Sequence, residues 1–75
     1  MVVVKSEIRA EIVGVAKKVF SRYGYRKTTM EGIARAAKMG KSSIYYYYKS
    51  KEEIFEAVVV REAQELKRQL EAVVN

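Results

Sequence analysis

The sequence predicts an all-α fold of three helices followed by a long fourth helix. Apolar residues recur at spacings of three and four along the chain, which is the period of an amphipathic helix. Proline is absent, so glycine and Ser or Thr at capping positions mark the breaks between helices. With 75 residues, the chain has room for one small domain near the lower size limit for folding alone.

The first helix is expected over residues 6–23. Ser6 is its candidate N-cap, and Gly24 fits the left-handed position that ends a helix. Gly14 lies in its interior, where glycine costs about 0.5–1 kcal/mol relative to alanine unless close packing needs the missing side chain. The apolar stripe consists of Ile8, Ile12, Val15, Ala16, Val19, Phe20 and Tyr23.

The second helix is expected over residues 29–37. Thr28 and Glu31 have the spacing of a capping box, but Thr29 could equally be the N-cap. The apolar face of this helix consists of Met30, Ile33, Ala34 and Ala37.

A third short helix is expected over residues 41–47, after a turn at 38–40 that contains Gly40. Ile44 and Tyr48 are four residues apart and can point to one core. Two short helices joined by such a turn form a helix-turn-helix, whose second helix enters the major groove of DNA. Residues 1–50 are therefore predicted to be a three-helix, helix-turn-helix DNA-binding domain.

The fourth helix is expected over residues 51–75. Ser50 and Glu53 form a capping box at its start. Some 20–24 helical residues reach about 30–36 Å, which the shorter helices do not cover. The distal apolar positions are therefore expected to lack a partner within this chain; they are Leu66, Leu70, Val73 and Val74.

Charge is distributed unevenly along the chain. There are 15 Lys+Arg and 9 acidic residues, for a formal net charge of +6. Residues 1–50 hold 11 basic and 3 acidic side chains, whereas residues 51–75 hold 4 basic and 6 acidic ones. A basic block suggests a surface that faces nucleic acid, although a solvated surface of skewed composition explains the charge alone equally well.

Several functional classes are excluded by residues that the chain lacks. There is no Cys, His or Asp, so we expect no disulfide, no ordinary zinc site and no Ser-His or Cys-His catalytic pair. We therefore expect no enzyme and no cofactor. No apolar run approaches the roughly 20 residues of a membrane-spanning helix, so we expect a cytoplasmic protein. The two capping boxes and the short turn-linked helix pair favour a globular fold over a basic amphipathic membrane binder, so we expect no membrane binding.

The exposed face of the third helix is the candidate binding surface. Its members carry hydroxyl or ammonium groups that can meet phosphates and base edges, and they are Lys41, Ser42, Ser43, Tyr45, Tyr46 and Tyr47. No acidic residue lies between Arg35 and Lys51, as a surface facing phosphates requires. Stacking of the tyrosines on single-stranded nucleic acid is a weaker alternative, because stacking platforms are usually β-sheets.

Two segments, 24–37 and 41–54, resemble the TetR (tetracycline-repressor) family of transcriptional regulators. The family hallmark around the third helix is matched by Ile44, Tyr45, Tyr48 and Lys51. The first helix also resembles the family in Ala16, Phe20 and Gly24. The resemblance covers roughly residues 8–60.

The resemblance implies a role for each candidate residue in sequence-specific binding of double-stranded DNA. Thr28 and Thr29 would lie at the start of the second helix, with Thr29 near a phosphate. Base edges or the adjoining backbone would be contacted by Lys41, Ser42, Ser43 and Tyr46. Phosphates would be bound by the hydroxyls of Tyr45 and Tyr47 and by Lys51 at the start of the fourth helix. Lys5 and Arg9 are not counted among the predicted contacts.

The chain departs from the family pattern in three respects. The family usually has glycine at the position of Lys38, so either the turn differs or Lys38 adopts a left-handed conformation at some cost. Tyr48 replaces the usual phenylalanine, and its hydroxyl needs a partner. Family members also continue into a larger helical domain, which implies that this chain is a fragment and that the fourth helix is a connector.

For the full-length protein, the resemblance implies a homodimer that reads a palindromic operator and usually represses transcription. A small-molecule effector would bind only in the missing domain, shifting the fourth helix and the spacing of the two recognition helices. The alternative function is a helical protein-interaction or self-association module that acts through the fourth helix.

Overall fold

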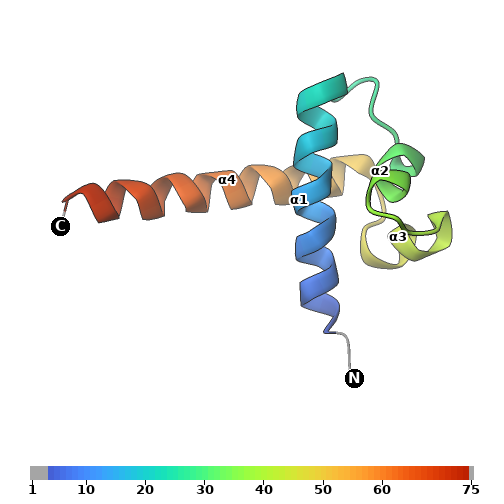
Figure 1. Ribbon diagram of the computed structural model, residues 1–75, viewed down its shortest axis with the longest axis horizontal. Coiled ribbons are helices and arrows are strands. Elements are labelled where there is room, and N and C mark those ends of the chain that lie inside the picture. The colour runs from blue at the N-terminus through green and yellow to red at the C-terminus, as the bar shows by residue number, and fades with distance from the viewer. Residues whose placement is uncertain (1–3, 75) are drawn as a thin grey trace.

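Four α-helices and no strand make up residues 4–74, the part of the chain that the computed structural model describes. They are α1 (Lys5–Tyr23), α2 (Met30–Ala36), α3 (Lys41–Tyr47) and α4 (Lys51–Val74). Figure 1 shows α1 crossing α4, with α2 and α3 on one side of α1 and the C-terminal half of α4 extending from the other. The predicted all-α class is confirmed.

The hydrophobic core lies where the four helices meet. Each helix contributes one isoleucine with at most 1% exposure, and these residues are Ile12, Ile33, Ile44 and Ile54. Burying a side chain of this size contributes about 1.5–3 kcal/mol, so these four anchor the packing of the helices. The remaining buried apolar residues are Val13, Ala16, Phe20, Met30, Ala34, Tyr48 and Val58.

The predicted apolar stripe of α1 needs two corrections. Val13 is buried although it was not assigned to the stripe, because α1 packs against α4 as well as α2 and therefore buries a wider face. Tyr23 is 56% exposed although it was assigned to the stripe, because it lies in the last turn of α1, which projects beyond the other helices in Figure 1.

Backbone groups, rather than capping side chains, define both ends of α1. The prediction that Ser6 caps the helix is wrong: the N-cap is Val4, and its carbonyl accepts from the amides of Glu7 and Ile8 at 3.0 and 3.3 Å. Gly24 ends the helix with a positive φ of 86°, as predicted, but its ψ of 156° lies outside the left-handed helical region. Such a backbone conformation is accessible almost only to glycine.

The start of α2 settles which threonine caps it. Thr29 is the N-cap, and its Oγ1 accepts a hydrogen bond from the Gly32 amide at 2.9 Å. The alternative capping box of Thr28 and Glu31 is not formed, and the helix begins one residue later than the predicted residue 29.

The start of α4 has the serine bond of the predicted capping box. Ser50 Oγ accepts from the Glu53 amide at 3.2 Å.

An ion pair joins α1 to α4: the Lys17 ammonium lies 2.7 Å from the Glu62 carboxylate. None of the helices within residues 4–74 combines the length and apolarity required to cross a membrane.

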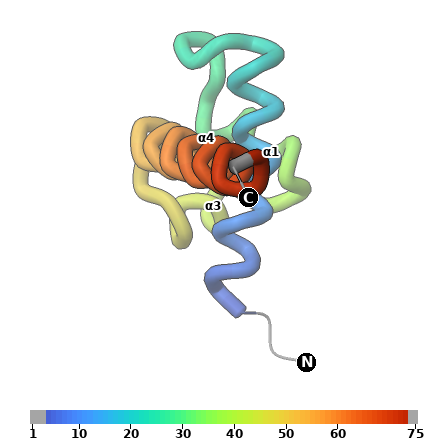
Figure 2. Tube along the Cα trace, turned by 90° about the vertical axis from the view of Figure 1, so that its left-hand side faces the viewer, coloured from blue at the N-terminus to red at the C-terminus, as the bar shows by residue number. Residues whose placement is uncertain are grey.

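The distal half of α4 has the exposed apolar positions that the sequence predicts. Leu66, Leu70 and Val73 are 57%, 58% and 83% exposed. Figure 2, which looks along α4, shows this part of the helix projecting toward the viewer. The side chain of Val74, along with residues 1–3 and 75, lies outside the described part of the chain.

Candidate nucleic-acid interface

The turn between α2 and α3 has the hydrogen bonds of a Schellman motif. The Lys38 amide donates to the Arg35 carbonyl at 3.1 Å, and the Met39 amide donates to the Ala34 carbonyl at 2.9 Å. Lys38 has a φ of 58°, so the left-handed alternative is the one realised. The turn therefore retains the geometry that glycine usually provides, at a cost of about 1–2 kcal/mol for a residue with a Cβ.

α3 is fixed by its inward side chains and leaves its other face open. Ile44 is fully buried and Tyr48 is 3% exposed, as predicted. The exposed residues of this helix are Lys41, Ser42, Ser43, Tyr45 and Tyr46. Tyr47 is half-buried and packs against the core, so its predicted position outside the fold is only partly correct.

The hydroxyls of Ser42 and Ser43 are not used to cap α3. The N-cap is Gly40, which has no side-chain hydrogen bond. Both serines lie in the exposed first turn, where a hydroxyl can donate to or accept from a base edge or a phosphate.

Lys41 lies close to one carboxylate. Its ammonium is 3.5 Å from Glu31 Oε1, and both side chains are more than 60% exposed. An exposed ion pair of this kind is worth about 0–1 kcal/mol, so Lys41 can exchange Glu31 for a phosphate or a guanine acceptor at little cost.

The two threonines before α2 lie in different environments. Thr28 is 3% exposed, and its hydroxyl donates to the Gly24 carbonyl at 2.7 Å. This placement does not fit the predicted DNA contact, because the hydroxyl already has a partner inside the fold. Thr29 is exposed, and while Oγ1 accepts from Gly32 its hydroxyl hydrogen is free to donate to a phosphate.

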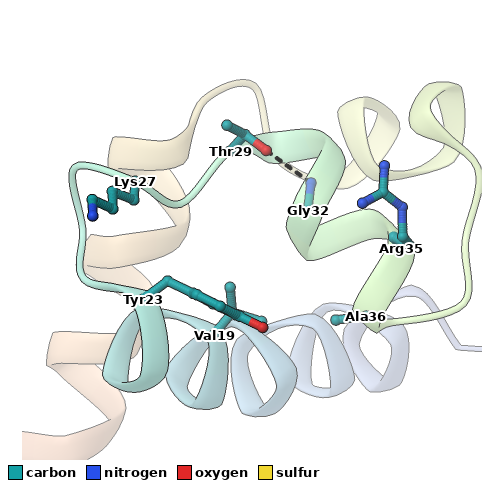
Figure 3. Close-up of a pocket in the computed structure, with 7 residues that line it drawn as sticks. All are labelled: Val19, Tyr23, Lys27, Thr29, Gly32, Arg35 and Ala36. Atoms are coloured by element: carbon teal, nitrogen blue, oxygen red, sulfur yellow. Dashed lines mark hydrogen bonds between the residues drawn. The ribbon is translucent and has the colours of Figure 1, made fainter.

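Two cations that were not predicted as contacts flank Thr29. Lys27 and Arg35 line an open groove of about 380 Å³ between α1 and α2. Figure 3 shows Lys27 and Arg35 on either side of Thr29, with Tyr23 lying along the α1 side of the groove. The basic run at 26–27 is the sequence signal that could have identified Lys27, whereas Arg35 required the orientation of α2.

Lys51 joins the start of α4 to the loop between α1 and α2. Its ammonium donates to the carbonyls of Tyr25 and Arg26 at 2.8 and 3.4 Å. It also lies 4.2 Å from the centre of the Tyr25 ring. An ammonium has three N–H donors, so one donor remains for the predicted phosphate.

The Tyr25 ring belongs to an aromatic cluster next to Lys51. Its centre lies 5.6 Å from that of Phe20 and 4.9 Å from that of Phe55. Burial and the neighbouring Glu52 carboxylate raise the pKa of Tyr25 above its usual value.

Arg9 and Lys5 of α1 contact the tyrosines of α3, which sequence reasoning did not predict. Arg9 Nη1 donates to the Tyr47 carbonyl at 2.6 Å, and the Lys5 ammonium lies 4.6 Å from the centre of the Tyr46 ring. Lys5 and Arg9 are four residues apart and share a helix face, but this spacing alone does not say what the face meets.

Comparison with known proteins identifies the family of these helices. Residues 12–58 match the family described as "Bacterial regulatory proteins, tetR family". The chain is 39% identical over 57 residues to the uncharacterized HTH-type transcriptional regulator YhgD of Bacillus subtilis, covering 76% of this chain and 30% of that protein.

Two further relatives extend the match. The HTH-type transcriptional regulator QacR of Staphylococcus aureus is 38% identical over 48 residues, covering 64% of this chain and 26% of QacR. HbdR of Aromatoleum is 37% identical over 73 residues, covering 92% of this chain and 32% of HbdR. The chain thus spans about a third or less of the length of these relatives, and it belongs to the TetR family, of which it carries the N-terminal DNA-binding domain.

Proposed function

We propose that this chain binds double-stranded DNA in a sequence-specific manner, with α3 in the major groove, as the DNA-reading part of a transcriptional repressor. The observation that carries this proposal is the face of α3, which presents two hydroxyls, an ammonium and two tyrosines to solvent, while Ile44 and Tyr48 hold its other face in the core. A groove about 12 Å wide admits an α-helix presented in this way.

Groups on α2, on the loop before it and at the start of α4 can bind phosphate, and they support the same orientation. Thr29, Lys27 and Arg35 lie on the α2 side, and Lys51 lies at the start of α4. We propose that these groups and the hydroxyls of Tyr45 and Tyr47 bind the DNA backbone. Phosphate contacts of this kind fix the register of the helix, and base contacts then supply specificity.

We also propose that the full-length protein is a homodimer that reads a palindrome and responds to a small-molecule effector. A two-fold symmetric protein reads two symmetric half-sites, so a palindrome is the expected operator. Repression is supported by the names of relatives that include the biofilm operon negative transcriptional regulator IcaR of Staphylococcus. Because DNA-binding regulators act where the chromosome is, we propose a cytoplasmic location.

Selection of bound duplexes from a random pool, followed by affinity measurements against salt, tests the proposal. We expect an enriched half-site and, for the three cations among the proposed phosphate contacts, a fall in affinity of about fortyfold between about 50 and about 200 mM salt. A pool without enrichment, or binding that does not weaken with salt, would contradict the proposal. The phosphate contacts are tested by Tyr45→Phe and Lys51→Ala: unchanged affinity and salt slope would show that these two assignments are wrong.

A second candidate function is self-association through α4. The observation that favours it is the run of Leu66, Leu70 and Val73, each more than half exposed on one long helix. Sedimentation across a concentration series tests it, with a dimer expected at high concentration. A strict monomer throughout the series would exclude this function for the 75-residue chain.

A further inference from the structure

The C-terminal end of α3 is held by a side chain from α1. Arg9 Nη1 donates to the Tyr47 carbonyl at 2.6 Å. The last carbonyls of a helix have no partner within the helix, and α3 has no basic residue in its own last turn. Arg9 therefore supplies, from 38 positions earlier in the chain, the cation that a helix C-terminus favours.

The same arginine is locked to the residue that follows α3. Its Cζ lies 4.3 Å from the centre of the Tyr48 ring, and the Tyr48 hydroxyl donates to the Arg9 carbonyl at 3.4 Å. Tyr48 is 3% exposed, so its ring cannot shift without disturbing the core. Three interactions thus fix both the backbone and the side chain of Arg9 relative to α3.

The exposed tyrosines continue outward from this anchor. The Tyr46 and Tyr47 rings meet edge to face with their centres 5.0 Å apart. Tyr47 is the residue whose carbonyl Arg9 holds, so the Arg9 contact and the contact of the Tyr46 ring meet at the same residue. Hydrogen bonds to base edges need donor–acceptor distances of about 2.7–3.2 Å, and a shift of about 1 Å at the end of α3 would break them.

We propose that Arg9 is a positioning residue for DNA recognition: it holds the C-terminal end of α3 at the angle that base readout requires, without contacting DNA itself. This inference rests on the proposed function of α3. Arg9 is half-buried and donates to a carbonyl of its own domain, whereas Lys5, one turn earlier, is exposed and lies over the exposed Tyr46 ring.

The test compares Arg9→Met and Arg9→Lys with wild type in the 75-residue chain. Lys67→Met, on the exposed distal part of α4, is the matched control for the loss of one charge. Affinity is measured for the duplex that the wild type selects and for a scrambled duplex of equal length, from about 50 to about 200 mM KCl. Thermal unfolding shows which variants are folded at the assay temperature, and amide hydrogen exchange of the free proteins reports on α3.

We expect both Arg9 variants to lose at least tenfold in affinity for the selected duplex and less than threefold for the scrambled one. The slope of affinity against salt should stay unchanged, and the amides at the end of α3 should exchange faster. Arg9→Lys should not rescue, because an ammonium has the charge but not the planar fork of a guanidinium. Lys67→Met should retain the specificity of the wild type.

Three results would overturn the positioning role. A salt slope lowered by about 0.9, with equal losses on both duplexes and rescue by Arg9→Lys, would make Arg9 a phosphate contact. An unchanged ratio of affinities for the selected and scrambled duplexes, together with a lower melting temperature, would mean that Arg9 only stabilises the fold. Unchanged exchange of the α3 amides would show that Arg9 does not hold the helix. A wild-type chain that prefers no duplex would instead contradict the proposed function, and this inference with it.

Discussion

Tyr48 and Arg9 contact each other twice, because the Arg9 guanidinium covers the Tyr48 ring and the Tyr48 hydroxyl donates to the Arg9 carbonyl. The hydroxyl that distinguishes Tyr48 from the phenylalanine usual in the family thus has a partner in α1. Tyr48 and Arg9 together join α1 to the end of α3.

Tyr48→Phe should cost less than about 1 kcal/mol in the free energy of unfolding. It removes a hydrogen bond that is already long at 3.4 Å but keeps the ring beneath the guanidinium. Tyr48→Ala should cost about 3–5 kcal/mol, because it removes a large buried side chain. Urea unfolding of both variants checks this, and a loss above 2 kcal/mol for Tyr48→Phe would show that the hydroxyl contributes far more than its geometry indicates.

Lys38→Gly should stabilise the domain. A residue with a Cβ at a φ of 58° destabilises the folded state by about 1–2 kcal/mol, and glycine removes this penalty. Glycine also gives the unfolded chain more conformational freedom, which costs about 0.4–1 kcal/mol of stability. The expected net gain in the free energy of unfolding is about 0.5–1 kcal/mol. Lys38→Ala is the control, since it removes the charge and keeps the backbone penalty. Equal stabilities of the two variants in urea unfolding would contradict the role of the turn.

Gly14→Ala and Gly24→Ala should have opposite effects on stability. A Cβ at Gly14 would approach only the flexible end of Arg61, with its Nη1 at 3.3 Å, so the gain in helix propensity of about 0.5–1 kcal/mol should prevail. A Cβ at Gly24 meets nothing within 4 Å, yet the φ of +86° should cost about 1–3 kcal/mol. Thermal unfolding shows whether each variant is more or less stable than the wild type. A destabilised Gly14→Ala would mean that the Arg61 side chain cannot move away from the new Cβ.

Ser50→Ala should destabilise the chain, and Ser6→Ala should not. Ser50 Oγ accepts from the Glu53 amide at the start of α4, and loss of such a cap costs about 0.5–2 kcal/mol. Ser6 lies within α1 without a capping bond, so alanine there should change stability by less than about 0.5 kcal/mol. Denaturant unfolding measures the stability of both variants. Equal losses of stability in Ser50→Ala and Ser6→Ala would contradict the role of Ser50 as the cap of α4.

Much of this fold could be predicted from the sequence because local signals mark the breaks. Gly40 marks the start of α3 and Ser50 the start of α4, and both starts agree with the predicted bounds. The start of α1 could not be predicted, since its N-cap is the backbone of Val4 rather than a polar side chain. Local patterns also could not distinguish Thr28 from Thr29, because the packing of the loop decides which hydroxyl turns inward.

The candidate site was predictable in part for the same reason. The exposed face of α3 follows from helical spacing around Ile44 and Tyr48. The contacts of Arg9 with α3 span 38 and 39 positions of sequence and depend on the crossing of two helices, which no local pattern encodes. Likewise, the sequence predicted a phosphate contact for Lys51, but its hydrogen bonds to the loop before α2 span 25 and 26 positions and could not be predicted.

The most direct test of the account compares Lys41→Ala with Lys67→Ala for binding to the duplex that the wild type selects. Both changes remove one positive charge, but the first alters the exposed face of α3 and the second the distal part of α4. If α3 reads DNA, Lys41→Ala should weaken binding about 5- to 150-fold, the equivalent of about 1–3 kcal/mol for a specific contact, while Lys67→Ala should bind nearly as the wild type does. Equal affinities for the two variants would contradict the assignment of α3 as the recognition helix.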